Sequence, residues 1–308
     1  MRAFITGSRG FVAGHLTTHL LEKGDEVDGT DRHDGPDLLD RDGWFDVLAD
    51  RTPEIVYHLA AQAAVGLSWE DPLPTIRANV EGTHNVLEAA RHAGAERAVI
   101  ISSADVYGRV TPAELPLTED RPARPVSPYA ASKAAAEMVA VQAWHGHRFP
   151  TVLVRPFNHI GPGQSGDFVA TALALRIAAA EAAGEASIIV GDLSARRDFS
   201  DVRDVVRAYR LLAERGEPGG LYHVCSEIDR SIQELADLLI ERANSPLELV
   251  VDDALLRPAE VPVLRGSAAH LRADTGWEPT IDFTVTIDDI LHDARERVAV
   301  DSARSDAQ

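Results

Sequence analysis

Short apolar runs alternate with segments of helical periodicity along the first half of the chain. The runs share β-branched residues and flanking Gly or Pro, which favour strands over buried helix segments. They lie at residues 3–5, 26–30, 55–59, 98–102 and 151–154. Helical patterns cover residues 11–23, 80–92 and 129–144. Strands that alternate with helices predict right-handed crossovers and a parallel sheet covered on both faces.

The alternation weakens in the second half, after a Gly-Pro-Gly turn at residues 161–163. Two apolar runs there predict strands, at residues 187–190 and 221–224. Four helical patterns cover residues 170–183, 202–215, 231–244 and 285–299. We therefore expect an α/β fold, with a Rossmann-type doubly wound parallel sheet and a smaller C-terminal lobe.

The expected domain boundaries follow from this change of pattern. Residues 1–165 should form the domain built on the parallel sheet, and residues 166–300 the smaller lobe, which is interleaved with the first by crossovers. The polar residues 301–308 are expected to form a disordered tail.

The turn between the first strand and the first helix is rich in glycine, and reads TGSRGFVAG over residues 6–14. Gly7 fits the turn out of the strand, and Gly10 permits close approach of the backbone to a pyrophosphate. Phe11 and Val12 open the helix whose N-terminus would face that anion, and Ala13 is small enough for the helix to pack on the strand. The pattern predicts a dinucleotide site.

An acidic residue at the end of the second predicted strand supports this interpretation. A carboxylate at Asp31 would accept from a ribose hydroxyl and repel a 2′-phosphate. The neighbouring Arg32 could instead hold such a phosphate. The sequence thus favours NAD(H) as the cofactor and leaves NADP(H) open.

Three residues predict an acid–base centre. Tyr129 and Lys133 stand at i and i+4 near the start of a long helix, so that the phenol and the ammonium share one face. The nearby cation is expected to lower the pKa of Tyr129 towards working pH. Ser103 ends the fourth predicted strand, where a parallel sheet places its ligand crevice, and could hydrogen-bond the same substrate oxygen.

Composition limits the classes of function. The chain has 308 residues, 30 Lys plus Arg against 49 Asp plus Glu, and a formal net charge of −19, which argues against nonspecific binding to nucleic acid or an anionic membrane. Its one cysteine, Cys225, excludes an internal disulfide. The nearest histidine pair, His145 and His147, lacks a third ligand, so no metal site is expected. We find neither a membrane span nor a signal peptide and expect a cytoplasmic protein.

With these motifs the chain resembles the extended short-chain dehydrogenases/reductases, a family that acts on nucleotide sugars. The resemblance covers nearly the whole chain and includes residues 37–40, 58–62 and 79–83. Three later segments are similar to GDP-4-keto-6-deoxy-D-mannose reductases: RPFNHIGPGQS at 155–165, RDFSDVRDVVRAY at 197–209 and RPAEVP at 257–262.

The resemblance implies roles for individual residues. Ser103, Tyr129 and Lys133 match the catalytic triad of the family. The implied cofactor contacts are Asp37 and Leu38 at the adenine, Leu59, Ala60, Ala61 and Gln62 at the ribose and phosphates, and Asn79 and Phe157 near the nicotinamide. The implied contacts to the diphosphate and nucleoside of the substrate are Asn158, Arg197 and Arg257. On so acidic a chain, arginines that face inward suit a dianion.

One departure from the family pattern favours reduction. Sugar-nucleotide 4,6-dehydratases usually carry Thr-Asp-Glu or Thr-Ser-Glu where this chain has Ser103, Ala104 and Asp105. Dehydration needs a base for the carbon 5 proton and an acid for the carbon 6 hydroxyl, and alanine can be neither. The expected activity is NAD(P)H-dependent 4-ketoreduction of a GDP-activated 4-keto-6-deoxyhexose to GDP-D-rhamnose or a close relative, with Asp105 positioning the substrate.

Two alternatives remain open at this point. One is a nucleotide-sugar 4-epimerase or 4,6-dehydratase that recycles tightly bound NAD. The other is a non-catalytic dinucleotide-binding regulator, against which the complete Ser/Tyr/Lys set argues. Relatives commonly pair through two helices that correspond to residues 80–92 and 129–144, so the resemblance implies a homodimer. The small residues Ala131, Ala135 and Ala136 would let the helices approach closely.

Overall fold

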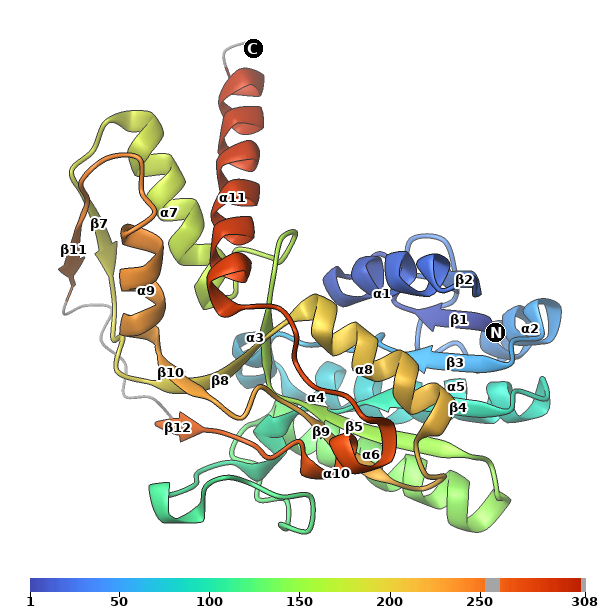
Figure 1. The fold of residues 1–308 in the computed structure, drawn as a ribbon. Coiled ribbons are helices and arrows are strands. Elements are labelled where there is room, and N and C mark those ends of the chain that lie inside the picture. Colours follow the sequence, from blue (N-terminus) through green and yellow to red (C-terminus); the bar gives the residue numbers. More distant parts are fainter. Residues whose placement is uncertain (253–260, 306–308) are drawn as a thin grey trace.

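A six-stranded parallel sheet forms the centre of the molecule (Figure 1). The computed structural model describes residues 1–252 and 261–305. The strand order is β2-β1-β3-β4-β5-β9. The strands are β1 (Arg2–Thr6), β2 (Glu26–Thr30), β3 (Ile55–His58), β4 (Arg97–Ile101), β5 (Thr151–Pro156) and β9 (Leu221–Val224). β3 and β5 are buried along their whole length, as expected for central strands covered on both faces.

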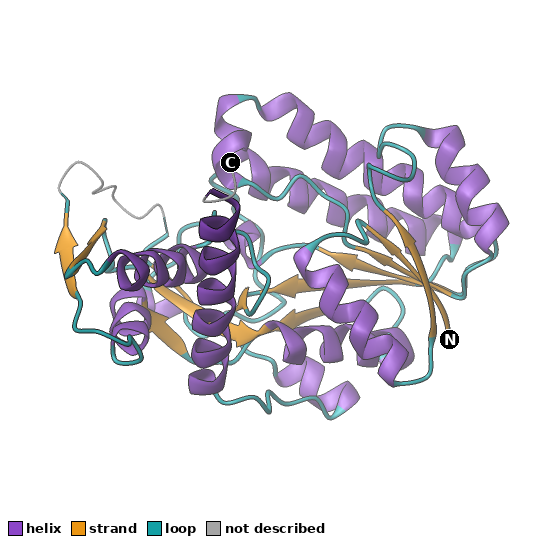
Figure 2. Cartoon of the chain, turned by 90° about the horizontal axis from the view of Figure 1, so that it is seen from above, coloured by secondary structure: helices purple, strands orange, loops and turns teal. Residues whose placement is uncertain are grey.

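Helices cover both faces of this sheet (Figure 2). One layer contains α1 (Phe11–Glu22), α8 (Val202–Arg215) and α10 (Ala269–Thr275), and the other α2 (Arg41–Arg51), α5 (Gly82–His92) and α6 (Pro128–His147). Because successive strand residues point to opposite faces, Ile5 and Tyr57 enter the core beneath α1 and α8, whereas Phe4 and Val56 enter the core beneath α2, α5 and α6.

A second lobe is built from the later part of the chain, at the left of Figure 1. Its larger sheet contains β6 (Asn158–Ile160), β8 (Arg196–Asp201), β10 (Asp229–Ser231) and β12 (Val263–Leu264). A separate parallel pair contains β7 (Ser187–Val190) and β11 (Glu248–Val251). The helices α7 (Val169–Ala183), α9 (Ile232–Ile240) and α11 (Phe283–Ser305) pack together over their own apolar core.

The predicted α/β class and doubly wound parallel sheet are confirmed. Two segments bear on the expected division, in which residues 166–300 interleave with the first domain by crossovers. The strand at 221–224 is β9, which leaves the lobe and pairs with β5 in the main sheet. Residues 301–305, expected to be disordered, continue α11. No Gly or Pro interrupts that helix, and the Ser302 hydroxyl donates to the Val298 carbonyl one turn earlier.

Several elements, most of them short, lack a clear signal in the sequence. They are α2, already described, α3 (Val65–Glu70), α4 (Pro72–Ile76), a π-helical turn η1 (Arg77–Glu81), and the 3-10 turns η2 (Ala104–Tyr107) and η3 (Pro112–Glu114). α3, α4 and η1 lead into α5 and pack against the start of α6. They span only five or six residues each, too few for a helical period to show in the pattern.

Candidate active site

The loops that leave β1 and β3 diverge at the point where the strand order reverses. β2 lies on one side of β1 and β3 on the other, and the carboxyl ends of the strands at such a point are where doubly wound sheets have their ligand crevice. Gly7 leaves β1 with a φ of 72°. A Cβ at Gly7 would lie 3.0 Å from the Cα of Ala60, so only glycine permits this approach. The structure thereby brings together two segments predicted to contact a cofactor.

Buried polar groups hold these two loops in place. His58 is 4% exposed, and its ring nitrogens lie 2.8 Å from the Thr6 hydroxyl and 3.0 Å from the Thr83 hydroxyl. The Thr6 hydroxyl also accepts from the backbone N–H of Ala60. Burial lowers the pKa of His58 to about 3, so the ring is neutral and can donate on one side while it accepts on the other.

The chemistry around the crevice fits a dinucleotide. α1 begins after Gly10, which makes no side-chain capping bond, so the first N–H groups of the helix face outwards without a side-chain acceptor. Such groups, with the positive end of the helix dipole, suit a pyrophosphate. The Gln62 side-chain oxygen is buried without a hydrogen-bond partner, as expected of a group that awaits a polar ligand.

The loop after β2 carries charges of both signs. The Asp31 carboxylate is 18% exposed, and its backbone N–H donates to Asp34 at 2.8 Å. Asp34 in turn pairs with Arg9 of the glycine loop at 2.6 Å. Arg32 is exposed. An acidic group for the ribose and basic groups for a 2′-phosphate therefore lie at the same end of the crevice.

The predicted adenine contacts lie beside α5. The Leu38 carbonyl accepts from the Asn85 side chain at 3.0 Å. A Cβ on Gly82 would lie 2.8 Å from the Leu38 side chain, so glycine lets this loop approach the helix. Asp37 is exposed and its carboxylate accepts from the N–H of Leu39.

The three predicted catalytic residues meet at the carboxyl end of β4. The Ser103 side chain hydrogen-bonds the phenol of Tyr129. The Lys133 ammonium donates to the carbonyl of Ile101, the last residue of β4, at 2.8 Å. Tyr129 and Lys133 are each 8% exposed. Residues at i and i+4 share a helix face, which is why both side chains reach the same strand end.

The start of α6 is fixed from two sides. Pro128 occupies the first turn, and the Ser127 side chain accepts from the N–H of Ala130 at 3.1 Å, which caps the helix. The Ser68 hydroxyl of α3 accepts from the N–H of Tyr129 at 3.2 Å. The position of the phenol therefore depends on α3 as well as on α6.

The expected lowering of the Tyr129 pKa is not what the structure shows. Burial and the charge of Asp105 raise the pKa of Tyr129, and only the hydrogen bond from Ser103 opposes them. Lys133 has its ammonium turned to the Ile101 carbonyl rather than to the phenol. Tyr129 is thus a neutral phenol at neutral pH, a state suited to giving a proton.

The structure describes three further predicted substrate residues, Asp105, Asn158 and Arg197, and the predicted cofactor residue Phe157. Asp105 lies close enough to Arg197 for its charge to oppose the lowering of the Arg197 pKa by burial. Asn158 is exposed on β6, the strand that pairs with β8, on which Arg197 stands. Arg257 lies outside the described residues. Phe157 is 2% exposed, and its ring packs on His223 at 5.2 Å, so this side chain faces the core and only its backbone can face a ligand.

Polar residues without a sequence signal complete the site. Glu137 and Arg155 form a buried ion pair directly behind Lys133, with side-chain exposures of 2% and 7%. A charged residue within an apolar strand, as Arg155 is within β5, is the one hint that sequence offers. Within residues 1–252 and 261–305, no group of three or more His, Cys, Asp or Glu could hold a metal ion. No helix in that described part is both long and apolar enough to cross a membrane.

Comparison with known proteins identifies the family. The family model described as GDP-mannose 4,6 dehydratase matches residues 35–290. The chain belongs to this family. A GDP-6-deoxy-D-mannose reductase of Pseudomonas aeruginosa is 40% identical over 299 residues, which cover 96% of this chain and 98% of that protein. A UDP-glucose 4-epimerase of Mycolicibacterium smegmatis is 32% identical over 304 residues, which cover 91% and 94%.

Solved structures agree with this assignment to the GDP-mannose 4,6-dehydratase family. RMD from Pseudomonas aeruginosa complexed with NADPH superposes with a TM-score of 0.89 at 38% identity, covering 96% of this chain and 100% of that chain. A Thermus thermophilus UDP-glucose 4-epimerase complexed with NAD gives a TM-score of 0.85 at 30% identity, covering 96% and 99%. The family resemblance predicted from the motifs is confirmed, and the chain is an enzyme of the short-chain dehydrogenase/reductase superfamily.

Proposed function

We propose that this enzyme reduces the 4-keto group of a GDP-activated 4-keto-6-deoxyhexose to give GDP-D-rhamnose or a close relative. The observation that carries the proposal is the meeting of Ser103, Tyr129 and Lys133 beside a crevice that fits a dinucleotide. The Pseudomonas aeruginosa relative, a GDP-6-deoxy-D-mannose reductase, supports the same reaction.

In this mechanism Tyr129 supplies the proton. Its phenol is neutral because burial and Asp105 raise the pKa of Tyr129, and it donates to the carbon 4 oxygen as negative charge develops there. Ser103, hydrogen-bonded to the same phenol, stabilises that oxygen. One N–H group of the Lys133 ammonium donates to the Ile101 carbonyl, and its two other N–H groups can donate to ribose hydroxyls. A bound reduced nicotinamide dinucleotide supplies the hydride for carbon 4.

The residues after β4 support reduction over dehydration. Ala104 is 2% exposed and carries no acid or base. Asp105 is the one acidic group in the three-residue segment, and its side chain is one methylene shorter than the Glu of dehydratases. Reduction requires neither a base at carbon 5 nor an acid at carbon 6.

We propose NAD(H) as the preferred cofactor, with NADP(H) as the alternative. Asp31 supports NAD(H), because its carboxylate would repel a 2′-phosphate. Arg9 and Arg32 support NADP(H), as does the NADPH in the Pseudomonas aeruginosa structure. Residues 1–165 would bind the cofactor and residues 166–300 most of the sugar nucleotide. Arg197 of the second range would hold the diphosphate together with Asn158 of the first.

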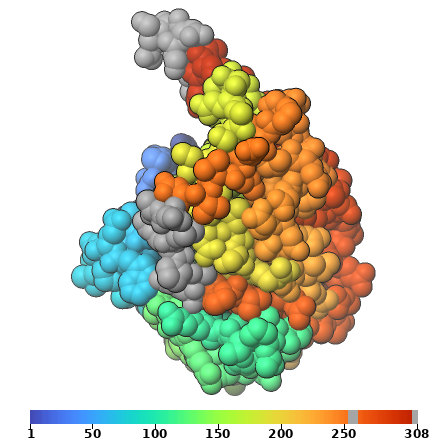
Figure 3. Space-filling model, turned by 90° about the vertical axis from the view of Figure 1, so that its left-hand side faces the viewer, coloured from blue at the N-terminus to red at the C-terminus, as the bar shows by residue number. Residues whose placement is uncertain are grey.

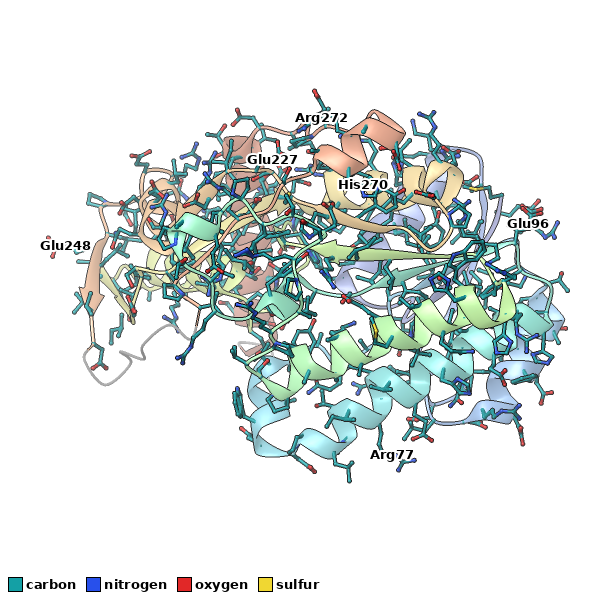
Figure 4. All side chains as sticks on the ribbon, turned by 90° about the horizontal axis from the view of Figure 1, so that it is seen from below. Arg77, Glu96, Glu227, Glu248, His270 and Arg272 are labelled. Carbon is teal, nitrogen blue, oxygen red and sulfur yellow. The ribbon has the colours of Figure 1, made fainter. Side chains whose placement is uncertain are left out.

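We also propose a homodimer, formed through the flank on which α5 and α6 lie side by side (Figure 4). Arg77 points outwards from this flank. Large apolar side chains of α3 and α4 are exposed next to it: Leu67, Trp69, Leu73 and Ile76, joined by Met138 of α6. Figure 3 shows the segment that carries α3 and α4, in cyan, standing out from the side of the molecule.

A clustered apolar surface of this kind suits a protein partner of the same chain. Ala131 and Ala135 are exposed on α6 as expected, but Ala136 is 5% exposed and belongs to the monomer core.

A cytoplasmic location is proposed on the acidic composition and the single cysteine.

The function is tested by incubation with GDP-, dTDP-, UDP- and CDP-4-keto-6-deoxyhexoses, each with NADH or NADPH. We expect loss of absorbance at the reduced-nicotinamide band with the GDP sugar, and NMR should identify the reduced carbon 4. A 4-epimerase would interconvert sugars without net consumption of cofactor. If no GDP sugar caused consumption of the reduced cofactor, the result would contradict the proposal.

A further inference from the structure

Consecutive residues at the end of β4 contact residues of α6 that lie one helical turn apart. The three pairs are Ile101 with Lys133, Ser102 with Glu137 and Ser103 with Tyr129. The Ser102 hydroxyl donates to the Glu137 carboxylate at 2.5 Å. Positions i, i+4 and i+8 share one face of α6. Glu137 therefore continues the face that carries the two catalytic side chains of this helix.

The Glu137 carboxylate is held rigidly. Arg155 of β5 donates to both of its oxygens, through Nε at 2.8 Å and one terminal nitrogen at 2.7 Å. The other terminal nitrogen of Arg155 donates to the Tyr107 phenol at 2.7 Å, and that phenol contacts His223 at 2.5 Å. A planar fork on a carboxylate fixes its orientation as well as its position.

This buried carboxylate acts on Lys133. Burial lowers the pKa of Lys133 to about 8, and the charge of Glu137 opposes that effect. Of the other titratable or charged groups, His58 of β3 interacts with the ammonium and is itself neutral, and Tyr129 lies on the same face of α6. Asp105 of η2 acts on Tyr129, and Arg155 of β5 acts on Glu137. Without the carboxylate, burial alone would act on the ammonium and favour loss of its proton.

We propose that Glu137 is a positioning residue of this active site. Its carboxylate, anchored by Arg155 and Ser102, lies one turn beyond Lys133 on the same face of α6 and stabilises the ammonium that donates to Ile101 at the end of β4. The remaining N–H groups of that ammonium can serve the ribose. The inference rests on the proposed function in one respect, that Lys133 and Tyr129 serve the reduction.

The lysine content permits a test that does not depend on turnover. The chain has two lysines, Lys23 and Lys133, and Lys23 is exposed at the end of α1. Isotope-labelled lysine therefore gives two side-chain NMR signals, whose titration midpoints can be followed separately. In Glu137→Gln the titration midpoint of Lys133 should fall by about one pH unit, which is the low end of the pKa shift that a nearby opposite charge produces. The midpoint of Lys23 should stay unchanged.

Activity provides the second readout. In the proposed function Lys133 acts in its charged form. A lower titration midpoint of Lys133 should therefore move the decrease of kcat at alkaline pH to lower pH. KM for the sugar nucleotide should change little. Glu137→Asp retains the charge and should restore most of the wild-type pH profile. A purely structural role would lower stability without moving the pH profile of the folded enzyme.

The matched control is Glu181→Gln in the second lobe. Arg295 donates to both Glu181 oxygens at 2.8 Å, so this substitution breaks an equivalent arginine fork far along the chain from Lys133. It should leave the Lys133 midpoint and the pH profile unchanged.

A second variant covers the case in which Glu137→Gln fails to fold. Glu137→Met combined with Arg155→Met replaces the whole pair by apolar groups, a kind of exchange that is often neutral for stability. It should still lower the Lys133 midpoint. An unchanged midpoint in the folded variants would overturn the inference. A lowered midpoint in an enzyme that reduces no 4-keto sugar would refute the proposed function and leave the role of Glu137 standing.

Discussion

The Asn79 side-chain amide donates to the Ser132 hydroxyl at 2.8 Å. The same amide group accepts from the backbone N–H of Gln62 at 2.8 Å and donates to the Gln62 carbonyl at 3.1 Å. Asn79 is 1% exposed, so its polar atoms are used within the protein. From the π-helical turn η1 it joins the loop after β3 to the helix that carries Tyr129 and Lys133. The cofactor role predicted for Asn79 would therefore be indirect, through the loop that it holds.

Replacement of Tyr129 by Phe should abolish turnover and leave cofactor binding nearly intact. The phenol acts on charge that appears mainly in the transition state, so its loss falls on kcat. We expect a decrease of about 10²- to 10⁴-fold, the usual contribution of a general acid. Steady-state kinetics and NADH titration by fluorescence measure the two effects. A variant that kept more than about a tenth of the wild-type turnover would rule out this role.

Replacement of Asp31 by Ala should narrow a preference for NADH over NADPH. The substitution removes the carboxylate that repels a 2′-phosphate and leaves Arg9 and Arg32 in place. The ratio of kcat/KM for the two cofactors is the measurement, with Asp42→Ala on the exposed start of α2 as a control for loss of one negative charge. If the wild type already prefers NADPH strongly, the arginines dominate and the prediction is wrong.

The enzyme should not dehydrate GDP-mannose. Offered GDP-mannose and NAD, it should form no 4-keto-6-deoxy sugar, because Ala104 supplies no proton and Asp105 has a short reach. Asp105→Asn should lower reductase turnover only modestly, through positioning of the substrate. NMR in deuterated water is the measurement. A 4-keto product carrying deuterium at carbon 5 would identify Asp105 as a base and the enzyme as a dehydratase.

Replacement of Leu73 by Glu should prevent formation of the proposed homodimer. Leu73 is 62% exposed on α4, among the apolar side chains proposed to face the second copy, and a buried unpaired carboxylate there would oppose association. Leu21, 56% exposed on α1 in the opposite helix layer, provides the control substitution Leu21→Glu. Light scattering at micromolar concentration measures the mass. A monomeric wild type would contradict the proposed assembly.

Stability should fall in acid because of two buried histidines. Burial lowers the pKa of both His58 and His223 to about 3 in the folded state, with Arg155 adding to the effect at His223. The unfolded imidazoles bind protons below about pH 6.5. The contribution of these two histidines to the free energy of unfolding should therefore be complete above about pH 6.5 and fall as the pH decreases towards 3, by about 1.4 kcal/mol per pH unit for each histidine.

The control for this pH dependence is His58→Gln. Glutamine does not titrate. The free energy of unfolding of the variant should therefore change with pH less steeply than that of the wild type, by about the 1.4 kcal/mol per pH unit that one histidine contributes. Urea unfolding at pH 7, 6 and 5 measures both curves. Parallel curves for the two proteins would show that His58 is not the group responsible.

The alternating pattern was enough to predict the sheet and the glycine loop, because each rests on local patterns in the sequence. The interpretation of Ser103, Tyr129 and Lys133 as a triad also needed the end of the fourth strand and the family resemblance. Gly7 and Gly10 lie in one turn, and Tyr129 and Lys133 on one helix face. The pattern did not predict α3 and α4, which are too short to show a period, nor the polar contacts of Asn79, whose partners come from three separate segments. It also assigned the wrong direction to the pKa of Tyr129.

The sequence by itself determined the fold class, the family and which side chains can take part in proton transfer, since these depend on local periodicity and on residue identity. Only the tertiary structure decided their electrostatic state. The direction of the Tyr129 pKa depends on burial and on Asp105, and the charge of Lys133 on a carboxylate held by Arg155 from another strand. The physical reason is that desolvation and Coulomb interactions act through distances in space, which separation along the chain does not reveal.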